Sequence, residues 1–243
     1  MSSRKLFCIS GSDARKFLQG LITNDINKLD QGIVYTALLT PQGKYICDFF
    51  LATHGNDILL DAPAQDADAL IKRLSMYRLR ADVQIAPSDL IVSTGLTEAP
   101  SDAQMDPRHP DMGWRLYGPT DVSEDVYWAA QRVPNCIPEH GIELTQDTFI
   151  LEAGFEPLNG VDFRKGCYVG QEVTARMKHK TELRKGFKTV GISQIVDIGT
   201  DILTQDDKVA GTVFTQANGQ AIAYLRFDRA KGPLRAGNAE IIL

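Results

Sequence analysis

The chain reads Lys165-Gly166-Cys167-Tyr168-Val169-Gly170-Gln171-Glu172 at residues 165–172, and this stretch is the most informative part of the sequence. Its two glycines permit the positive φ angles or close backbone approaches that tight turns require. Cys167 follows Arg164 and Lys165, and neighbouring cations favour the thiolate, which is the form that acts as a nucleophile or metal ligand. If residues 171–179 form a helix, its N-terminal dipole also favours an anion near Cys167. The stretch is followed by basic residues, namely Arg176, Lys178, His179 and Lys180.

Residue chemistry alone leaves two interpretations of Cys167 open. It is either a reactive thiol or a buried, inert cysteine in a tight turn, because unpaired cysteines are among the most buried residues. The pattern K-G-C-Y-x-G-Q-E, however, resembles the signature of the YgfZ-type family of folate-binding proteins, and it matches along the whole of residues 165–172. That family belongs to the superfamily of the aminomethyltransferase (T-protein) of the glycine cleavage system.

The resemblance implies a fold and a cofactor. It implies an α+β protein with an aminomethyltransferase-like folate-binding region of mixed antiparallel sheets and helices over residues 1–184, built from two interleaved subdomains. A small C-terminal β-barrel is implied over residues 185–243. Tetrahydrofolate or another reduced folate is the implied cofactor.

Composition limits the other classes of function. The 243 residues are 43% hydrophobic and 23% charged, which is ordinary for a globular protein and argues against disorder. The net charge of −5 argues against a large nucleic-acid surface. No apolar run approaches the roughly 20 residues that span a bilayer, so we expect no membrane partner. The residues after Met1 lack the apolar segment of a secretory signal.

The cysteines indicate a reducing compartment. All four are far apart in sequence and none forms a C-x-x-C pair, which favours free thiols and predicts no metal site. We therefore expect the chain in the cytoplasm, or in the mitochondrial matrix if it is eukaryotic.

Asp48 is a carboxylate inside an apolar strand. Strands are predicted over 34–39 and 44–52, joined as a hairpin by the turn at 41–43. A carboxylate in the second strand needs either a partner or a solvent-facing position, and the sequence leaves both open. The resemblance implies that Asp48 is catalytic and lies near N5 and N10 of the folate. The aminomethyltransferases typically have two consecutive aspartates here, and Cys47 replaces the first of them.

Glu152 is the second acidic candidate. A short helix is predicted over 145–154, beginning at Thr145 and ending at Gly154. Leu-Glu-Ala-Gly at 151–154 resembles a superfamily segment whose glutamate binds the pterin ring. A carboxylate suits that role because it accepts two adjacent N–H groups at once. The alternative is a helix glutamate in a salt bridge. Ile150 departs from the superfamily, which often has an arginine there.

Two further segments resemble the superfamily. Leu-Ile-Thr-Asn-Asp at 21–25 is similar to its L-x-x-N-D helix ending, so Asn24 is a folate-binding candidate, with a solvated loop as the alternative. Tyr-Arg-Leu-Arg at 77–80 resembles its Y-x-L-R segment. Arg80 is a candidate for an anion such as a folate glutamate tail, and a solvated helix end is the alternative.

The remaining pattern places the other elements. A helix is predicted over 64–78, a mobile loop without core residues over 97–112, and a helix after Ser123 with Val126, Tyr127 and Ala130 facing inward. Short strands are predicted over 186–193, 208–216, 220–227 and 239–243, with a tight turn at Asn218-Gly219. Several short strands with little helix favour a closed barrel.

The resemblance implies a function in the assembly or repair of iron–sulfur clusters, with iron–sulfur client or assembly proteins as partners. Cys167 would attack a one-carbon unit, transiently bind iron, or form a mixed disulfide. The main alternative is a tetrahydrofolate-dependent aminomethyltransferase or demethylase acting on a small amine. A hydrolase that pairs Cys167 with His140 or His179, and a scaffold that binds folate only for stability, are further alternatives. Whether the protein is an enzyme is left open.

Overall fold

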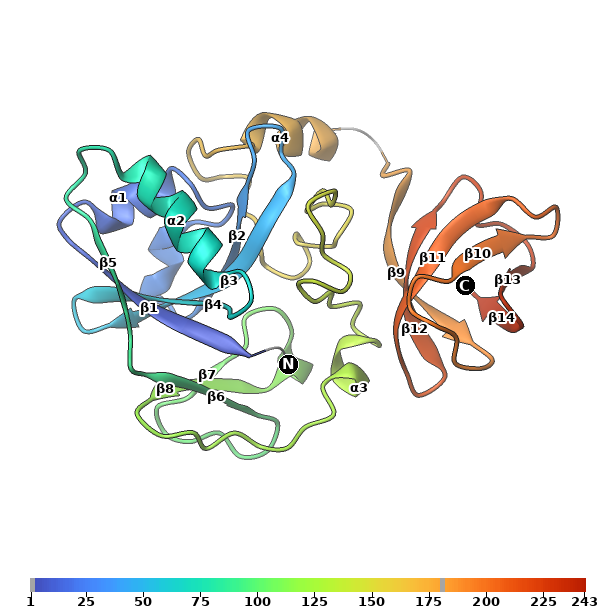
Figure 1. The fold of residues 1–243 in the computed structure, drawn as a ribbon, viewed down its shortest axis with the longest axis horizontal. Coiled ribbons are helices and arrows are strands. Elements are labelled where there is room, and N and C mark those ends of the chain that lie inside the picture. The colour runs from blue at the N-terminus through green and yellow to red at the C-terminus, as the bar shows by residue number, and fades with distance from the viewer. Residues whose placement is uncertain (1–2, 180–181) are drawn as a thin grey trace. The chain divides into compact units, whose positions relative to one another are not determined.

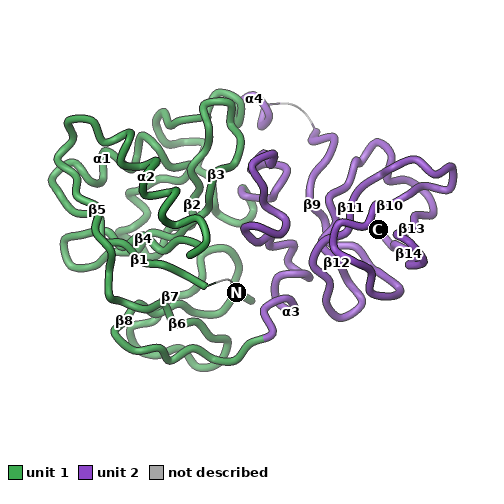
Figure 2. The backbone as a smooth tube through the Cα atoms, viewed as in Figure 1, with its two compact units in different colours: residues 1–126, 156–175 green, residues 127–155, 176–243 purple. Residues whose placement is uncertain are grey.

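The computed structural model describes residues 3–179 and 182–243. Met1 and Lys180, which the sequence analysis used, lie outside these ranges. The chain divides into two compact units (Figure 2). Unit 1 comprises residues 1–126 and 156–175, and unit 2 comprises residues 127–155 and 176–243. The mixture of helices and antiparallel sheets confirms the predicted α+β class (Figure 1).

Unit 1 contains a five-stranded antiparallel sheet in the order β2-β3-β4-β1-β5 and a three-stranded sheet in the order β6-β8-β7. The strands of the first sheet are β1 (Arg4–Ser10), β2 (Val34–Leu39), β3 (Tyr45–His54), β4 (Asp57–Pro63) and β5 (Gln84–Pro87). Those of the second are β6 (Ile91–Gly95), β7 (Gln104–Met105) and β8 (Trp114–Gly118). The helices are α1 (Ala14–Gln19), α2 (Ala67–Arg78) and two 3-10 turns, η1 (Ile26–Asp30) and η2 (Pro110–Met112).

The core of unit 1 lies between the five-stranded sheet and its helices. Every residue of β2 is buried, and α2 turns Ala67, Leu70 and Leu74 toward the sheet at the spacing of one helix face. Figure 1 shows α1 and α2 on this sheet. The sheet thereby fixes the position of Asp48, which lies on β3 directly opposite Ala37 of β2.

Unit 2 contains a closed barrel of six strands in the order β10-β11-β12-β9-β14-β13. They are β9 (Lys185–Ile192), β10 (Asp201–Thr204), β11 (Val209–Ala217), β12 (Gln220–Arg226), β13 (Leu234–Ala236) and β14 (Ala239–Ile242). Asn218 and Gly219 have φ angles of 52° and 74°, as a two-residue hairpin turn requires, which confirms the predicted turn. The closed barrel confirms the C-terminal architecture. The remaining helices among the described residues are α3 (Ala129–Arg132) and α4 (Gln171–His179).

The helix predicted over 145–154 is wrong. The segment forms consecutive turns whose backbone hydrogen bonds change spacing, from Ala153 N–H to Phe149 O and from Phe155 N–H to Ile150 O. Residues 150–153 are buried in succession, unlike the alternating burial of an amphipathic helix, whereas residues 145–147 are exposed. Packing around residues 150–153 therefore sets the backbone there.

The helix predicted after Ser123 is also wrong. Only the four residues of α3 are helical, and Tyr127 is 65% exposed rather than inward. The residues before it lie along β6, because Glu124 N–H donates to Thr94 O at 2.9 Å and the Glu124 carboxylate accepts from Leu96 N–H at 2.9 Å. These bonds hold the segment outside a helix.

The expectation of no core residues over 97–112 is wrong as well. Asp106, Arg108 and Met112 are all buried. The prolines keep the segment irregular, but Asp106 and Arg108 are buried as a pair, and Asp106 also pairs with Arg115 of β8. In the part of the chain that the structure describes, no helix has the length and apolar character needed to cross a membrane.

Candidate functional site

The K-G-C-Y-V-G-Q-E turn is attached to the rest of unit 1 at both of its ends. At the first end, the Lys165 ammonium donates to the carbonyl oxygens of Gln19, Ile22 and Asn24 at 2.8, 2.6 and 3.0 Å. It also lies 4.9 Å from the centre of the Tyr168 ring. Burial lowers the pKa of Lys165 to about 8. The Lys165 charge is therefore directed at the carbonyls between α1 and η1.

The second end of the turn is attached through Gly170. This residue has φ of 84°, and a Cβ there would lie 2.6 Å from Thr40 O, in the turn between β2 and β3. Only glycine permits that approach without displacing backbone. On the adjoining helix, Thr174 Oγ1 donates to Gly170 O at 3.3 Å. The turn is thus pressed against the hairpin that carries Asp48.

The remaining motif residues support this conformation. The Gln171 side chain accepts from Tyr168 N–H at 3.3 Å, and the Tyr168 ring is buried. Glu172 lies in the first turn of α4, where a carboxylate interacts favourably with the helix dipole. The helix expected over 171–179 is confirmed at both ends.

Cys167 is exposed, so the buried, inert interpretation is wrong. A Cβ added at the preceding Gly166 would contact nothing within 4 Å, which leaves the middle of the turn open. The two anchors therefore present the thiol on a fixed but accessible turn. Cys8 and Cys136, by contrast, are partly buried, and Cys47 lies in the core of unit 1.

Asp48 is buried, with 5% of its surface exposed, so the solvent-facing interpretation of this residue is wrong. The Tyr45 hydroxyl donates to Asp48 Oδ1 at 2.5 Å and accepts from Asp48 N–H at 3.0 Å. Burial and the Asp48 charge raise the pKa of both Tyr45 and Tyr35. Burial, and then the Asp48 charge, likewise raise the pKa of Cys47. Cys47 is therefore a protonated core residue rather than a second acid.

Asn24 is buried and its side chain is committed to internal hydrogen bonds. Its Nδ2 donates to Tyr35 O at 2.8 Å and Asn159 O at 2.6 Å, and its Oδ1 accepts from Asp25 N–H and Lys28 Nζ. The structure thus brings Asn24 and Asp48 to the same region of unit 1, with Tyr35 bonded to one and electrostatically coupled to the other. A cavity of about 250 Å³ is lined there by Asn24, Lys28, Tyr35, Pro107 and Asn159, with Gln31–Val34.

Glu152 belongs to unit 2 and is buried, with 8% of its surface exposed. The Tyr224 hydroxyl of β12 donates to Glu152 Oε2 at 2.7 Å. Lys185 Nζ lies 4.0 Å from Oε1, and Phe187 N–H donates to the Glu152 backbone carbonyl at 2.8 Å. Burial and then Glu152 raise the pKa of Tyr224. The barrel therefore holds this carboxylate in a defined orientation by the Tyr224 hydroxyl, with Lys185 as an ion-pair partner at 4.0 Å, so the salt-bridge interpretation of Glu152 stays open.

Arg80 is exposed in the loop after α2. Cys167, Asp48, Asn24 and Arg80 all belong to unit 1, whereas Glu152 belongs to unit 2. His140 and His179, which the hydrolase alternative required, flank different segments: His140 pairs as a bridge with Leu144, and His179 ends α4.

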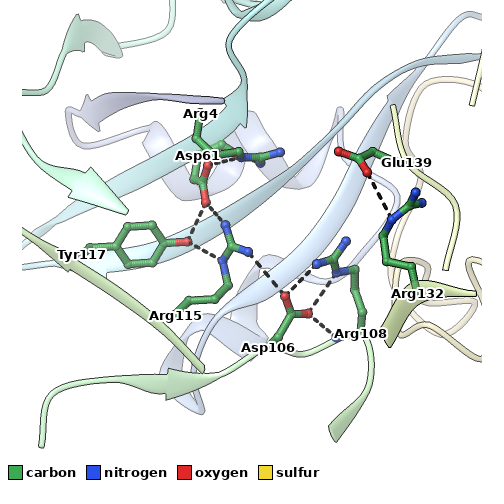
Figure 3. Close-up of polar contacts among 8 residues, drawn as sticks. All are labelled: Arg4, Asp61, Asp106, Arg108, Arg115, Tyr117, Arg132 and Glu139. Carbon is green, nitrogen blue, oxygen red and sulfur yellow. Dashed lines mark hydrogen bonds and ion pairs between the residues drawn. The ribbon is translucent and has the colours of Figure 1, made fainter. Parts of the chain in front are cut away.

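Sequence reasoning missed a buried network of charged residues in unit 1 (Figure 3). Asp61 of β4 accepts from Arg4 at 2.6 Å, from Tyr117 at 3.0 Å and from Arg115. Asp106 pairs with Arg108 at 2.8 Å and with Arg115 at 3.4 Å. The Arg115 guanidinium lies 3.9 Å from the centre of the Phe50 ring. The network members are Arg4, Asp61, Asp106, Arg108, Arg115 and Tyr117.

This network joins the two sheets of unit 1, because Asp61 lies on β4 and Arg115 on β8. Burial alone would raise the pKa of Asp61, but the Arg4 and Arg115 charges outweigh it and lower the pKa. The same balance with Arg108 lowers the pKa of Asp106. Arg115 sits between Trp114 and Leu116, so a charge within an apolar strand was the available signal, as it was at Asp48.

The fold defines the class of protein first. The structure resembles the crystal structure of glycine cleavage system aminomethyltransferase T from Bartonella henselae, with a TM-score of 0.77 and 16% sequence identity. The likeness covers 98% of this chain and 81% of that one. Residues 184–243 match the family described as CAF17, C-terminal beta-barrel domain. The chain therefore has the aminomethyltransferase fold with a CAF17-type barrel.

The relatives then define the family. The mouse protein "Iron-sulfur cluster assembly factor IBA57, mitochondrial" is 30% identical over 287 aligned residues, which cover 99% of this chain and 80% of the mouse protein. This chain belongs to the IBA57 family of iron–sulfur cluster assembly factors. The IBA57 homolog of Pyricularia oryzae is 28% identical over 76% of this chain and 54% of its own length. The chain spans about half the length of such fungal relatives.

Proposed function

We propose that this chain is a folate-binding protein of YgfZ type that acts in the assembly or repair of iron–sulfur clusters. The observation that carries the proposal is its 30% identity to mouse IBA57 along 99% of this chain. The aminomethyltransferase fold supports tetrahydrofolate, or another reduced folate, as the cofactor. Iron–sulfur client or assembly proteins are the proposed partners.

Glu152 would hold the pterin. Its buried carboxylate can accept the adjacent ring and amino N–H groups of a pterin in a charge-assisted pair. The Tyr224 hydroxyl fixes Oε2 while each carboxylate oxygen retains further acceptor capacity. Preorganisation by Tyr224 would reduce the ordering cost of binding.

Asp48, Asn24 and Arg80 have different parts in this proposal. Asp48 would lie near the nitrogens that carry the one-carbon unit, held in place by Tyr45. Asn24 would act by shaping the site, because its hydrogen bonds fix Tyr35 and Asn159. Arg80 is exposed and would reach only the glutamate tail of the folate.

Cys167 would supply the reactive thiol. Its exposure on a turn anchored at Lys165 and Gly170 suits attack on a one-carbon unit, transient binding of iron, or a mixed disulfide with a partner. Each of these steps requires that the reaction partner reach the thiol while the turn keeps its conformation. The anchors provide the fixed position, and the open surface at Gly166 provides the access.

Complementation of cells that lack their own IBA57 relative tests the function. The parent chain should restore the activity of iron–sulfur enzymes, and Cys167→Ala should not, while its melting temperature stays within about 2 °C of the parent because the thiol is exposed. Cys8→Ala, which changes a partly buried cysteine on β1, should restore activity. Full complementation by Cys167→Ala would contradict the proposed role of the thiol.

A second candidate is a tetrahydrofolate-dependent aminomethyltransferase or demethylase acting on a small amine. The TM-score of 0.77 to an aminomethyltransferase favours it, and the core position of Cys47 in place of a second aspartate counts against it. Turnover of an amine donor with tetrahydrofolate, lost in Asp48→Asn, would establish this activity instead.

The names of the relatives bear on location. Mouse IBA57 is named as mitochondrial, so for a eukaryotic chain we propose the mitochondrial matrix over the cytoplasm. The folate and cluster-assembly roles are both compatible with either compartment.

A further inference from the structure

The end of α2 carries an exposed patch that shares only Arg80 with the folate candidates and does not include Cys167. We call it the α2 tip and define it as Lys72, Arg73, Met76, Leu79 and Arg80. Met76 and Leu79 are 72% and 89% exposed, which makes Leu79 the most exposed large apolar side chain among the described residues. In Figure 1, α2 leads into β5 through a loop at the edge of unit 1.

The patch follows from the helix periodicity. Ala67, Leu70 and Leu74 face the core, and residues 72, 73 and 76 lie on the opposite side at spacings of three and four. Tyr77 packs against the core and does not belong to the patch. A surface helix normally places polar residues on this outer side, so Met76 and Leu79 depart from the pattern.

Leu79 also has an unusual backbone. Its φ of 47° and ψ of −109° lie outside the regions that side chains with a Cβ favour. Such conformations are costly and persist where the surroundings enforce them, often at functional sites. Here the result is a leucine that projects into solvent at the end of the helix.

Between Asp68 and Asp82, the charged residues next to Met76 and Leu79 in sequence are all positive. Residues 70–80 contain Lys72, Arg73, Arg78 and Arg80 and no acid, although the whole chain carries −5. Arg78 donates to Val83 O at 3.2 Å. Within residues 3–179 and 182–243, Lys72, Arg73 and Arg80 make no ion pair. The tip thus combines projecting apolar groups with uncompensated cations.

We propose that the α2 tip docks on the surface of an anionic phospholipid bilayer. Leu79 and Met76 would enter the boundary between headgroups and acyl chains, and Lys72, Arg73 and Arg80 would pair with lipid phosphates. A bilayer accepts side chains that project from a convex tip, because it needs no matching pocket. Such a surface contact differs from spanning a bilayer, so it is compatible with the finding that no helix of the described residues could cross one.

Two other polyanions fit less well. RNA would satisfy the cations but would leave Met76 and Leu79 uncovered, and the tip offers no exposed aromatic ring for base stacking. An acidic protein would need an apolar pocket shaped to Leu79. The lipid proposal is independent of folate binding, because α2 and its tip contribute no residue other than Arg80 to the folate candidates.

Co-sedimentation of the full chain with vesicles tests the proposal. The chain should bind phosphatidylcholine vesicles in which roughly a third of the lipid is phosphatidylglycerol, and should not bind pure phosphatidylcholine. Lys72→Gln with Arg73→Gln should weaken binding about 25-fold, at roughly fivefold for each lost cation. Leu79→Gly should weaken it about tenfold while raising the melting temperature, because glycine relieves the strained φ. That opposite change separates docking from folding.

Matched changes in unit 2 serve as controls. Ile195→Ser removes another exposed apolar residue (85% exposed) and Lys188→Gln another exposed cation, and neither should change vesicle binding. Absence of parent binding to the anionic vesicles would overturn the proposal. So would equal losses in the control variants. Binding of poly-L-glutamate or an RNA oligonucleotide through the tip, without vesicle binding, would assign the patch to another polyanion and would also overturn it.

Discussion

Asp61 is the residue whose removal should most disturb unit 1. It is fully buried and accepts from Arg4, Arg115 and Tyr117. In Asp61→Asn the Arg115 guanidinium, which is 1% exposed, would lose its closer carboxylate and keep the Asp106 carboxylate at 3.4 Å. A buried charge that loses its partner costs about 3–5 kcal/mol. We expect the free energy of unfolding of unit 1 to fall by about that amount.

The assay can be restricted to unit 1. The chain has two tryptophans, Trp114 in unit 1 next to Arg115 and Trp128 in unit 2. In a Trp128→Phe background, the fluorescence of Trp114 during urea denaturation reports the unfolding of unit 1 alone. Arg4→Gln serves as the comparison, because it leaves Asp61 with two donors and should cost less.

A double-mutant cycle tests the reasoning directly. Replacing a buried ion pair by neutral groups often costs little, whereas breaking it is expensive. Asp61→Asn with Arg115→Met should therefore be less destabilising than the sum of the single changes by about 2 kcal/mol or more. A cost of Asp61→Asn below about 1 kcal/mol, or additive single effects, would refute the assignment of an uncompensated buried charge.

Other residues give further expectations. Gly170→Ala should lower the free energy of unfolding of unit 1, measured in urea, by about 2–4 kcal/mol, because its Cβ would lie 2.6 Å from Thr40 O. Gly166→Ala, at an open surface position, should change it by less than about 0.5 kcal/mol. Equal effects of the two substitutions would contradict the anchored turn. Burial lowers the pKa of Lys165 to about 8, so between about pH 8 and 10.5 the unfolded chain binds more protons than the folded one. The free energy of unfolding should therefore rise with pH across that window, and Lys165→Met should flatten the rise. Arg4, Arg115 and Arg108 hold the pKa of Asp61 and of Asp106 below the ordinary 3.8. The stability that these carboxylates contribute is therefore present above about pH 4 and should be lost as the pH falls below it. An acid titration in which Trp114 fluorescence shows no loss of stability in this range would contradict the charge network.

Sequence patterning recovered elements that carry a clear local signal, such as an apolar run, a helix beginning after a glycine turn, or an Asn-Gly pair. The hairpin strand Val34–Leu39, the helix Gln171–His179 and the barrel turn at Asn218-Gly219 were predicted where the structure has them. The helix predicted over 145–154 failed because residues 150–153 are buried in succession, so the periodicity of apolar residues carried no information about the backbone there. The division at residues 184 and 185 stays a prediction.

The sequence identified individual candidate residues of the site, but not how they are arranged in space. The buried state of Asp48 and the exposure of Cys167 each settled alternatives that the sequence left open. The roles of Lys165 and Gly170 as anchors depend on contacts with residues more than 100 positions away in the chain, at 19–24 and at 40, which no local pattern encodes. The Asp61 and Asp106 network was missed although Arg115 within an apolar strand was a local signal, because the partners of Arg115 come from other segments of the chain.

Titration calorimetry with tetrahydrofolate, comparing the parent chain with Glu152→Gln and Glu240→Gln, tests the folate proposal most directly. Glu240 is an exposed carboxylate on β14 and serves as the matched control. We expect the parent and Glu240→Gln to bind with the same Kd, and Glu152→Gln to bind at least roughly tenfold more weakly, because a charge-assisted pair to the pterin is lost. Equal affinity in all three chains, or no binding by the parent, would contradict the account.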